Sequence, residues 1–580
     1  MSSRSQPILT WRATAWRSRV VLFLIIGALI AVMVKAFALQ HLHVEQWQKR
    51  AEVRFERVRD IPAARGRLLD RNGVALAVSI PEHRLGLVPS HFNKALQGQA
   101  QPARKLDELA SIVGIPKSEI LRRARESKQF FYLTSGLDLE KADQIRALKI
   151  KGLELEQEFR RHYPYGEVFA NVVGFTGQDD RGQEGIEKAF DKILKGEQGS
   201  ERVLVDRRNV AFGQRQYSPA APGDDLRLSL DTGLQTIAFQ AVRDAMQQHR
   251  AKAASAVVLD ARTGELLAMV NAPSFNPNER QRLDPAKVRN RVVTDTFEPG
   301  STLKPFTIAT ALDAAVIRPD TRFQTASGMM TISGRTIRDS SPHGNLDVNG
   351  ILEKSSNIGM AQIALRLPAQ TLFERHRMVG FGSTPSLELP GMVSGRLRPW
   401  QGWVAIDQAT LSYGHGVSVS LLQLARAYTV FTRSGEILPV SLTPVTDAVI
   451  GDPVFSSATA SRVRDMLERA TGPEGTAPRA RIQGFRVAGK TGTAHKPERG
   501  GYAKNRYIAS FVGFVPVEQP RFIIGVMVDE PAAGEHYGGQ VAAPVFARIA
   551  SEGLRRLQMS PDPAIRILPD PVKVASGAPY

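Results

Sequence analysis

Ser301 and Lys304 stand three residues apart, at the start of a long apolar run. Proline is tolerated only near the beginning of a helix, so Pro305 predicts that a buried helix starts close to Ser301. This spacing puts the hydroxyl and the amine on one face within a single turn, where a buried amine could activate a serine nucleophile. A serine that only caps the helix is the ordinary alternative.

Two later segments add further groups for acyl chemistry. Ser355 and Asn357 place a hydroxyl and a carboxamide two residues apart, although a local turn is the common role of such a pair. The third segment is the run Lys490-Thr491-Gly492-Thr493, which we interpret as part of an extended strand. Its glycine would let the backbone of a substrate approach the strand.

A nucleotide-binding loop is the alternative interpretation of the third segment. Residues 484–491 match the pattern G-x-x-x-x-G-K-[ST]. Such a loop must follow a buried strand and open a helix. Residues 477–482 do not form a buried strand pattern, and Gly492 and Pro497 oppose a helix. We therefore reject nucleotide binding and predict a strand over 485–494.

The elements that must position these segments indicate one large α+β domain over residues 223–560. Strand patterns occur near its beginning, at 254–260 and 265–270, and near its end, at 507–515 and 521–528. Helical periodicity covers 232–248 and 541–557, with further helices between. A proline-containing linker at 218–225 separates this domain from residues 40–222, and a proline-rich tail follows at 561–580.

Residues 40–222 contain no cluster of acids, bases or nucleophiles, and we interpret them as a scaffold. Asn72-Gly73 between two apolar runs predicts a hairpin. Helical patterns follow near 102–113, 117–126 and 139–148.

The N-terminus carries an apolar span at 20–39, which is about 30 Å long as a helix and can cross a bilayer. Arginines without acids precede it in residues 1–19, so the positive-inside rule places the N-terminus in the cytoplasm and the rest outside. A cleaved signal peptide is the alternative, because Ala36-Phe37-Ala38 has the form of a cleavage site. Both interpretations export the chain.

Composition excludes several classes of protein. The chain has 580 residues and no cysteine, which excludes disulfide scaffolds, thiolate metal sites and a cysteine nucleophile. The net charge is +19, from 76 basic and 57 acidic residues. These charges are spread along the chain without a nucleic-acid-binding motif, so no nucleic acid partner is expected. No metal or other cofactor is expected either.

Ser-x-x-Lys, Ser-x-Asn and Lys-Thr-Gly in this order are the signature of penicillin-binding proteins and serine β-lactamases. The chain resembles class B penicillin-binding proteins along nearly its whole length, through residues 65–73, 162–177 and 182–187 of the scaffold. Within that class it is similar to the septal, FtsI-like D,D-transpeptidases of Gram-negative bacteria, through 412–428 and 537–546. The resemblance implies a single transmembrane helix, an elongated mixed α/β pedestal, and a transpeptidase domain with an antiparallel sheet covered by helices and an all-helical lobe.

The resemblance also implies roles for the three segments. Ser301 would be the acyl-ester nucleophile, Lys304 the general base and Ser355 a proton relay. Asn357 would hold a substrate amide, Lys490 with Thr491 and Thr493 the terminal carboxylate, and Gly492 would complete that substrate-binding strand. The backbone N–H groups of Ser301 and Thr493 would form the oxyanion hole.

The implied reaction is cross-linking of peptidoglycan stem peptides at the division septum, with D,D-carboxypeptidase hydrolysis as a related activity. The implied partners are glycan strands made from lipid-linked precursors, an FtsW-like glycosyltransferase, other division proteins, the inner membrane and β-lactam antibiotics. The implied location is the inner membrane, in a single pass, with the catalytic domain in the periplasm.

Three alternatives remain open at this point. One is an elongation-type class B protein. Another is a β-lactamase or β-lactam sensor, although no Leu-Asn pair supplies the deacylating base of class A enzymes. The third is a non-catalytic division scaffold, which would not require all three segments to be intact.

Overall fold

The computed structural model describes residues 15–42, 56–98, 102–205, 211–279, 283–498, 501–562 and 565. Most of the predicted cytoplasmic segment and of the predicted C-terminal tail therefore lies outside the described residues. The chain divides into two compact units, one of Met1–Ala63 with Glu197–Ala221 and one of Ala64–Gly196 with Pro222–Tyr580.

The first unit contains the N-terminal helix and a small sheet. Helix α1 (Ala15–Phe37) continues into a π-helical turn, η1 (Ala38–Leu42), and contains most of the predicted span. The stretch Ala15–His41 is long and apolar enough to cross a membrane. Strands β1 (Glu56–Ile61), β8 (Gly199–Val205) and β9 (Ala211–Ser218) form an antiparallel sheet in that order.

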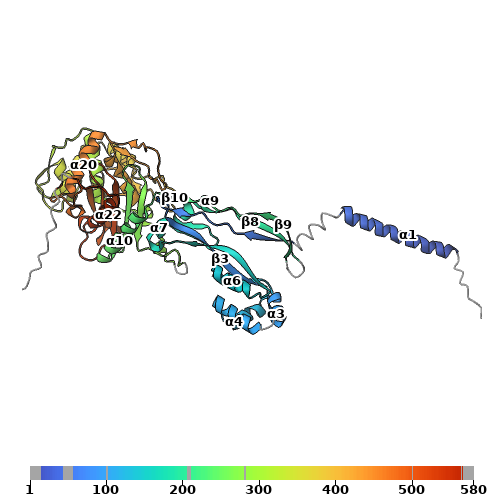
Figure 1. The fold of residues 1–580 in the computed structure, drawn as a ribbon. Helices are drawn as coiled ribbons and strands as arrows, with labels where there is room; N and C mark the ends of the chain where they lie inside the picture. The colour runs from blue at the N-terminus through green and yellow to red at the C-terminus, as the bar shows by residue number, and fades with distance from the viewer. Residues whose placement is uncertain are drawn as a thin grey trace, which may run out of the picture. The chain divides into compact units, whose positions relative to one another are not determined.

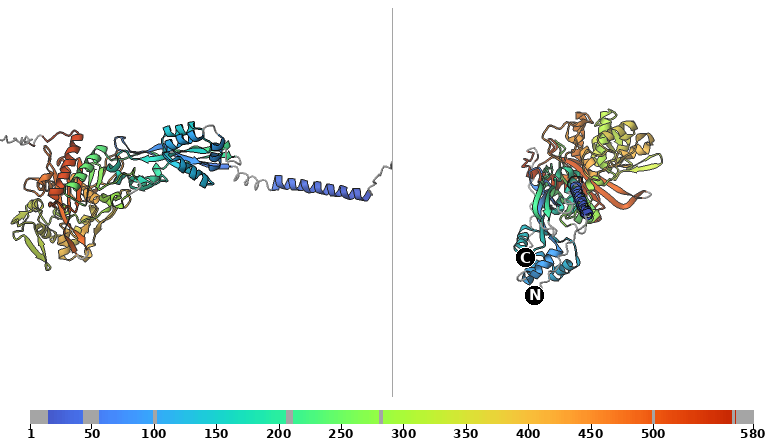
Figure 2. Two further views of the ribbon diagram at one scale, coloured as in Figure 1. Left: turned by 90° about the horizontal axis from the view of Figure 1, so that it is seen from below. Right: turned by 90° about the vertical axis from the view of Figure 1, so that its right-hand side faces the viewer.

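A small head in the second unit is built on strand β3 (Ala75–Leu87), which pairs with β4 (Phe131–Leu137) and β5 (Leu153–His162). Helices pack against the end of this ladder around one apolar cluster, as Figures 1 and 2 show. These helices are α3 (Pro89–Gly98), α4 (Pro102–Val113), α5 (Lys117–Glu126) and α6 (Leu139–Ala147). The three helices predicted in this region are confirmed.

The predicted hairpin at Asn72-Gly73 is also present. The carboxylate of Asp70 accepts hydrogen bonds from the backbone N–H groups of Asn72 (2.7 Å) and Val74 (2.8 Å), and Gly73 has a φ of +86°. The turn joins β2 (Leu68–Leu69) to β3, and β10 (Leu226–Arg227) pairs with β2 in parallel. Short elements complete this region: η2 (Gly166–Val168), α7 (Ala170–Val173), β6 (Phe175–Thr176), β7 (Gly182–Glu184), α8 (Gly185–Ala189) and α9 (Asp191–Leu194).

The C-terminal part is built on a five-stranded antiparallel sheet with β21 at one edge. Its order is β12 (Leu266–Ala272), β11 (Ala253–Asp260), β23 (Phe522–Asp529), β22 (Gly501–Val515) and β21 (Ala488–Glu498). Alternation along the strands separates two cores, because Val257 belongs to one and Val258 to the other. The terminal helices α10 (Thr232–Gln248) and α22 (Ala543–Arg556) cover the face that carries Val258 (Figure 1).

The other face carries a larger helical lobe. Its helices are α13 (Lys304–Asp313), α14 (Val348–Lys354), α15 (Asn357–Ala364), α16 (Ala369–Met378), α17 (Ala405–Leu411), α18 (Leu421–Ala427), α19 (Thr429–Thr432) and α20 (Ser457–Thr471). Two small hairpin-like sheets belong to it, β13 (Arg322–Gln324) with β16 (Asn345–Asp347) and β14 (Met329–Ile332) with β15 (Arg335–Arg338). The α+β fold, with an antiparallel sheet between helical layers, is therefore confirmed.

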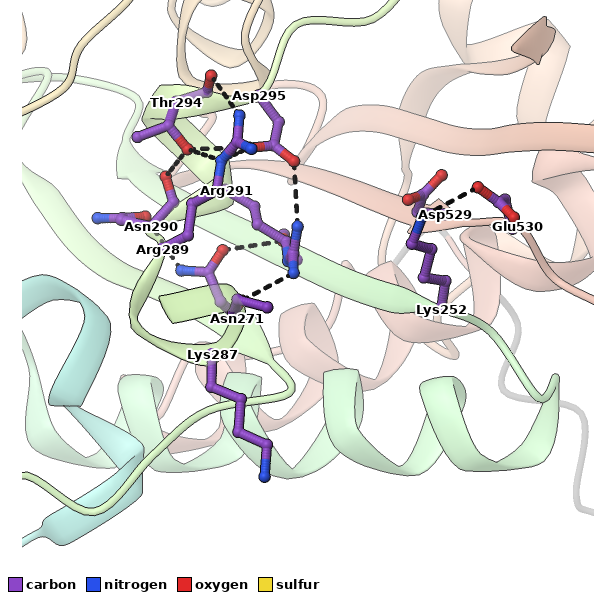
Figure 3. A network of polar contacts seen from close by, with 12 residues as sticks. Lys252, Asn271, Lys287, Arg289, Asn290, Arg291, Thr294, Asp295, Asp529 and Glu530 are labelled. Atoms are coloured by element: carbon purple, nitrogen blue, oxygen red, sulfur yellow. Dashed lines mark hydrogen bonds and ion pairs between the residues drawn. The ribbon is translucent and has the colours of Figure 1, made fainter. Parts of the chain in front are cut away.

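A polar network fixes the chain that leads from β12 to the segment of Ser301 (Figure 3). Asn271 on β12 donates from its amide to Oδ1 of Asn290 (3.0 Å). Asp295, which follows helix α12 (Arg291–Thr294), forms ion pairs with Arg289 (2.6 Å) and Arg291 (3.3 Å). These ion pairs connect the two ends of the helix. The segment before residue 300 is thus held at both ends of this short helix.

Candidate active site

The first segment lies in a 3₁₀ turn, η4 (Gly300–Leu303), followed directly by α13. The predicted helix start near Ser301 is therefore confirmed, with one tight turn between Ser301 and the α-helix. Ser301 is half-buried and Lys304 is fully buried. The hydroxyl of Tyr428 donates to the carbonyl of Thr302 (2.8 Å), which anchors this turn on the core.

Lys304 joins the first segment to the second. Its Nζ donates to the carbonyl oxygen of Ser355 (2.5 Å), to Ser355 Oγ (3.1 Å) and to Asn357 Oδ1 (2.8 Å). Burial, and then the positive charge of Lys490, lower the pKa of Lys304 well below its ordinary value, while Asp339 opposes this shift. The ammonium form has an acceptor for each hydrogen, and the lowered pKa makes the neutral amine accessible.

The second segment is the junction between α14 and α15. Ser355 ends α14 in the left-handed conformation (φ 61°), and Ser356 caps α15 by accepting from the N–H of Gly359 (3.0 Å). The left-handed turn places the Ser355 side chain beside Lys304 instead of continuing the helix.

Sequence reasoning missed Asp339, which holds this junction in place. Its carboxylate accepts from Ser356 Oγ (2.6 Å) and from the backbone N–H groups of Asn357 (2.5 Å) and Ile358 (3.0 Å). Asp339 directly follows β15, and no motif spacing links it to Ser355, so the sequence carries no signal for it.

The third segment lies on the edge strand β21, as predicted. Lys490 is fully buried, and its Nζ donates to Oγ1 of Thr476 (3.2 Å) and Oγ1 of Thr491 (3.2 Å). Burial lowers the pKa of Lys490 to about 7. The hydroxyl of Thr491 also donates a hydrogen bond to Thr476 Oγ1 (3.0 Å). Thr476 is the second residue that sequence reasoning missed.

The outer edge of β21 faces the turn that carries Ser301. A Cβ placed on Gly300 would lie 3.7 Å from the backbone nitrogen of Thr493, and one on Gly492 would lie 2.8 Å from the carbonyl of Pro299. Only glycine at residue 492 allows this approach. Gly538 donates its N–H to Thr493 Oγ1 (3.0 Å), which orients that hydroxyl. All the predicted site residues therefore lie close to the turn that carries Ser301.

A second group of side chains borders this place. The carboxylate of Glu298 accepts from the N–H of Gly416 (2.8 Å) and from the hydroxyl of Tyr502 (3.1 and 3.0 Å). His415 lies between two rings, with centroids 5.2 Å from Tyr413 and 6.0 Å from Tyr502. His415 therefore packs against neighbouring aromatic side chains. Among the described residues, no group of three His, Cys, Asp or Glu side chains could hold a metal ion.

Comparison with known proteins agrees with this architecture. Residues 254–551 match the family model of the penicillin-binding protein transpeptidase domain, and residues 60–228 match that of the penicillin-binding protein dimerisation domain. The chain is 36% identical to "Peptidoglycan D,D-transpeptidase FtsI" of Escherichia coli, over 94% of this chain and 93% of that protein. It is 40% identical to "Probable peptidoglycan D,D-transpeptidase PenA" of Neisseria meningitidis, over 93% of each.

Solved structures give the same result. The transpeptidase domain of penicillin-binding protein 3 from Burkholderia pseudomallei is 44% identical and has a TM-score of 0.54, covering 58% of this chain and 97% of that one. A peptidoglycan synthetase from Bifidobacterium adolescentis, 23% identical, shares the fold over 87% of this chain and 98% of that one, with a TM-score of 0.70. The chain belongs to the class B penicillin-binding proteins and is a peptidoglycan D,D-transpeptidase of the FtsI/PenA type.

Proposed function

We propose that Ser301 is the acyl-ester nucleophile of this transpeptidase and Lys304 its general base. The observation that supports this most strongly is the burial of Lys304, with its Nζ held by Ser355 and Asn357. A buried amine with a lowered pKa can accept the proton of a serine three residues away at the start of its helix.

In the first half-reaction, the neutral amine of Lys304 takes the proton of Ser301 Oγ. The oxygen attacks the carbonyl between the two terminal D-alanines of a stem peptide. The N–H groups of Ser301 and Thr493 stabilise the oxyanion, and losing one such donor typically costs about 3–4 kcal/mol. Ser355 Oγ, which contacts Lys304 Nζ, passes a proton to the leaving D-alanine nitrogen.

Substrate binding is assigned to the groups around this step. Asn357 holds a substrate amide. Lys490, with the Thr491–Thr493 strand segment and its Gly492, holds the terminal carboxylate. The ester then passes to an amine of a second stem peptide, which closes the cross-link, while attack by water gives carboxypeptidase hydrolysis. A β-lactam mimics the D-alanyl-D-alanine end and remains on Ser301.

Intact-mass analysis after incubation with benzylpenicillin tests this assignment. We expect a persistent adduct of one drug mass on the wild-type protein and none on Ser301→Ala. Ser394→Ala is the matched control and should acylate normally, because among the described residues the Ser394 hydroxyl bonds only the carbonyl of Gly395. An adduct that disappears within seconds would indicate a β-lactamase, and no adduct on the folded wild type would favour the scaffold.

We further propose the organisation that the relatives suggest. It comprises a cytoplasmic segment (1–19), a transmembrane helix (20–39), a periplasmic pedestal (40–222), a periplasmic transpeptidase domain (223–560) and a flexible tail (561–580). The protein would act at the division septum of the inner membrane with an FtsW-like glycosyltransferase and other division proteins. The relative named FtsI supports the septal assignment.

A fluorescent fusion to the full chain separates septal from elongation use. Fluorescence concentrated at midcell in dividing cells, with filamentation on depletion, supports the septal role. Fluorescence along the side wall, with rounded cells on depletion, would support the elongation-type alternative.

A further inference from the structure

Glu298 places a carboxylate beside the nucleophilic turn without a compensating cation. It is half-buried and lies three residues before Ser301. Its contacts are neutral donors, the N–H of Gly416 and the hydroxyl of Tyr502. Within the part of the chain that the structure describes, no ion pair joins it to a Lys, Arg or His side chain. The hydrogen bonds of this carboxylate lie at the exposed surface, so a positively charged ligand can reach it from solvent.

Aromatic rings and one imidazole surround this carboxylate. Tyr502, which is 49% exposed, presents a ring that a solvent-borne ligand can reach. Such faces attract ammonium groups. His415, between Tyr502 and Tyr413, has an enclosed Nδ1 that makes no hydrogen bond to any described residue. A proton from a bound ligand can therefore reach the ring only through its other nitrogen, Nε2.

Burial lowers the pKa of His415 most, and Lys304 and His495 lower it further, against the opposing effect of Glu298 and of the Tyr413 backbone. The neighbouring hydroxyls of Tyr413 and Tyr502 have pKa values raised to about 12, so neither is ionised near pH 7.

The backbone connects this cluster to the nucleophile. The N–H of Gly300 donates to the carbonyl of Gly414 (3.2 Å). The two glycines lie so close together that a Cβ placed on Gly414 would be only 2.2 Å from the carbonyl oxygen of Gly300. Gly414 immediately precedes His415, and Gly300 immediately precedes Ser301. The segments that carry Glu298 and His415 are therefore joined through the backbone to the turn that carries Ser301.

We propose that Glu298, Tyr502 and His415 form the binding site for the acceptor amine, the second substrate of cross-linking. This inference rests on the proposed role of Ser301. A primary amine arrives as an ammonium ion, which Glu298 and the ring of Tyr502 bind. It gives one proton to His415, and the neutral nitrogen attacks the ester carbonyl. The C–N bond forms, the C–Oγ bond breaks, the second proton passes to Ser301 Oγ, and His415 returns its proton to water.

The test measures how the acyl-enzyme divides between acceptors. The full-length protein in detergent is acylated with an N-acyl-D-alanyl thioester and then offered Nα-acetyl-lysine amide, whose side chain is cationic, or methanol, which is neutral. Products are counted by mass spectrometry relative to hydrolysis. Glu298→Gln keeps an acceptor oxygen but loses the charge, so we expect the amine-to-water ratio to fall about tenfold or more, as for loss of a charged hydrogen bond. The methanol-to-water ratio should stay within about twofold of wild type.

Further variants separate the possible outcomes. Glu374→Gln, on the exposed side of α16, is the matched control and should behave as wild type. His415→Gln should shift the pH dependence of aminolysis without shifting that of methanolysis. If Glu298→Gln does not fold, Tyr502→Leu at its half-exposed position should still lower the amine ratio.

Each result has one meaning. Selective loss of aminolysis supports the acceptor site. An unchanged amine ratio in acylated Glu298→Gln, or an equal fall for amine and methanol, overturns it and leaves the role of Ser301 intact. Failure of the wild-type protein to form the acyl-enzyme would instead overturn the proposed function.

Discussion

At the scale of single residues, the proposed catalytic geometry depends on polar groups that have no place in the three motifs. Asp339 is the clearest case, because its carboxylate receives a hydroxyl and two backbone N–H groups from the Ser355–Asn357 junction. Charge-assisted hydrogen bonds of this type are roughly twice as strong as neutral ones. Asp339 also opposes the lowering of the Lys304 pKa, so its charge acts on the proposed base directly.

We predict that Asp339→Asn slows acylation by penicillin about tenfold or more while the protein stays folded, because an amide accepts fewer of the three hydrogen bonds. The ascending limb of the pH–rate profile should also move to lower pH, since Asp339 raises the pKa of Lys304. The measurement is the acylation rate constant between pH 5 and 9. Asp320→Asn, on an exposed loop, is the control. A variant with wild-type rates at every pH would show that the carboxylate has no positioning role.

The lowered pKa of Lys490 predicts that the stability of the protein depends on pH. Its pKa is about 7 in the folded protein and 10.5 ordinarily, so between these values the unfolded chain holds a proton that the folded chain has lost. The free energy of unfolding therefore rises with pH across this window, and the full cost of the buried charge is present below it. Lys490→Met should stabilise the protein by about 2–3 kcal/mol more at pH 6 than at pH 9.

The control variant for this prediction should change the stability in the opposite direction. Lys496 on the same strand is buried in part, but its ion pairs with Asp529 and Glu530 outweigh that and raise its pKa. Lys496→Met should therefore destabilise the protein at both pH values. Urea unfolding of the two variants gives the answer, and an equal gain for Lys490→Met at pH 6 and pH 9 would contradict the assignment.

At the scale of elements, the sequence predicts those whose signals are local. Helix α10 occupies the predicted range 232–248, because apolar periodicity and a capping residue, Asp231, agree on it. The strand that carries Lys490 was predictable from its glycines and flanking residues. The 3₁₀ turn at Ser301, the left-handed Ser355 and the contacts of Asp339 were not, since each is imposed by tertiary partners that are distant along the chain.

A buried ion cluster is another element-scale feature without a local signal. Glu187 on α8 accepts from Arg65 Nε (2.7 Å) and Arg161 Nε (2.7 Å), and all three side chains are fully buried. Arg65 also pairs with Asp191 on α9 (2.7 Å). The cluster thus ties the residues before β2, strand β5 and two short helices together.

We predict that Glu187→Gln lowers the free energy of unfolding by about 3–5 kcal/mol, because it leaves two buried guanidinium groups with too little negative charge. Urea denaturation followed by circular dichroism measures this loss. Penicillin acylation by the fraction that stays folded should remain normal, since the cluster is outside the catalytic site. Glu119→Gln breaks an exposed pair with Arg122 and should cost less than about 1 kcal/mol. Equal losses for the two variants would mean that burial does not matter here.

At the scale of the whole molecule, α1 is the element that fits a membrane anchor. None of the described side chains of α1 is buried. Its large apolar residues are exposed, which is unfavourable in water. A helix of 23 residues is about 35 Å long, which suits a bilayer. The proposed catalytic groups all lie in the other compact unit.

The last prediction follows from that separation. A chain without residues 1–42 should leave the membrane fraction but acylate with benzylpenicillin at the wild-type rate, because no catalytic contact comes from α1. Replacing residues 15–42 by an unrelated transmembrane helix should restore resistance to alkaline extraction and leave the acylation rate unchanged, which controls for loss of length. Intact mass of the membrane-extracted wild type should retain residues 1–39. A mature chain that begins after Ala38 would instead identify the segment as a cleaved signal peptide, and slower acylation of the truncated chain would show that the anchor supports the catalytic unit.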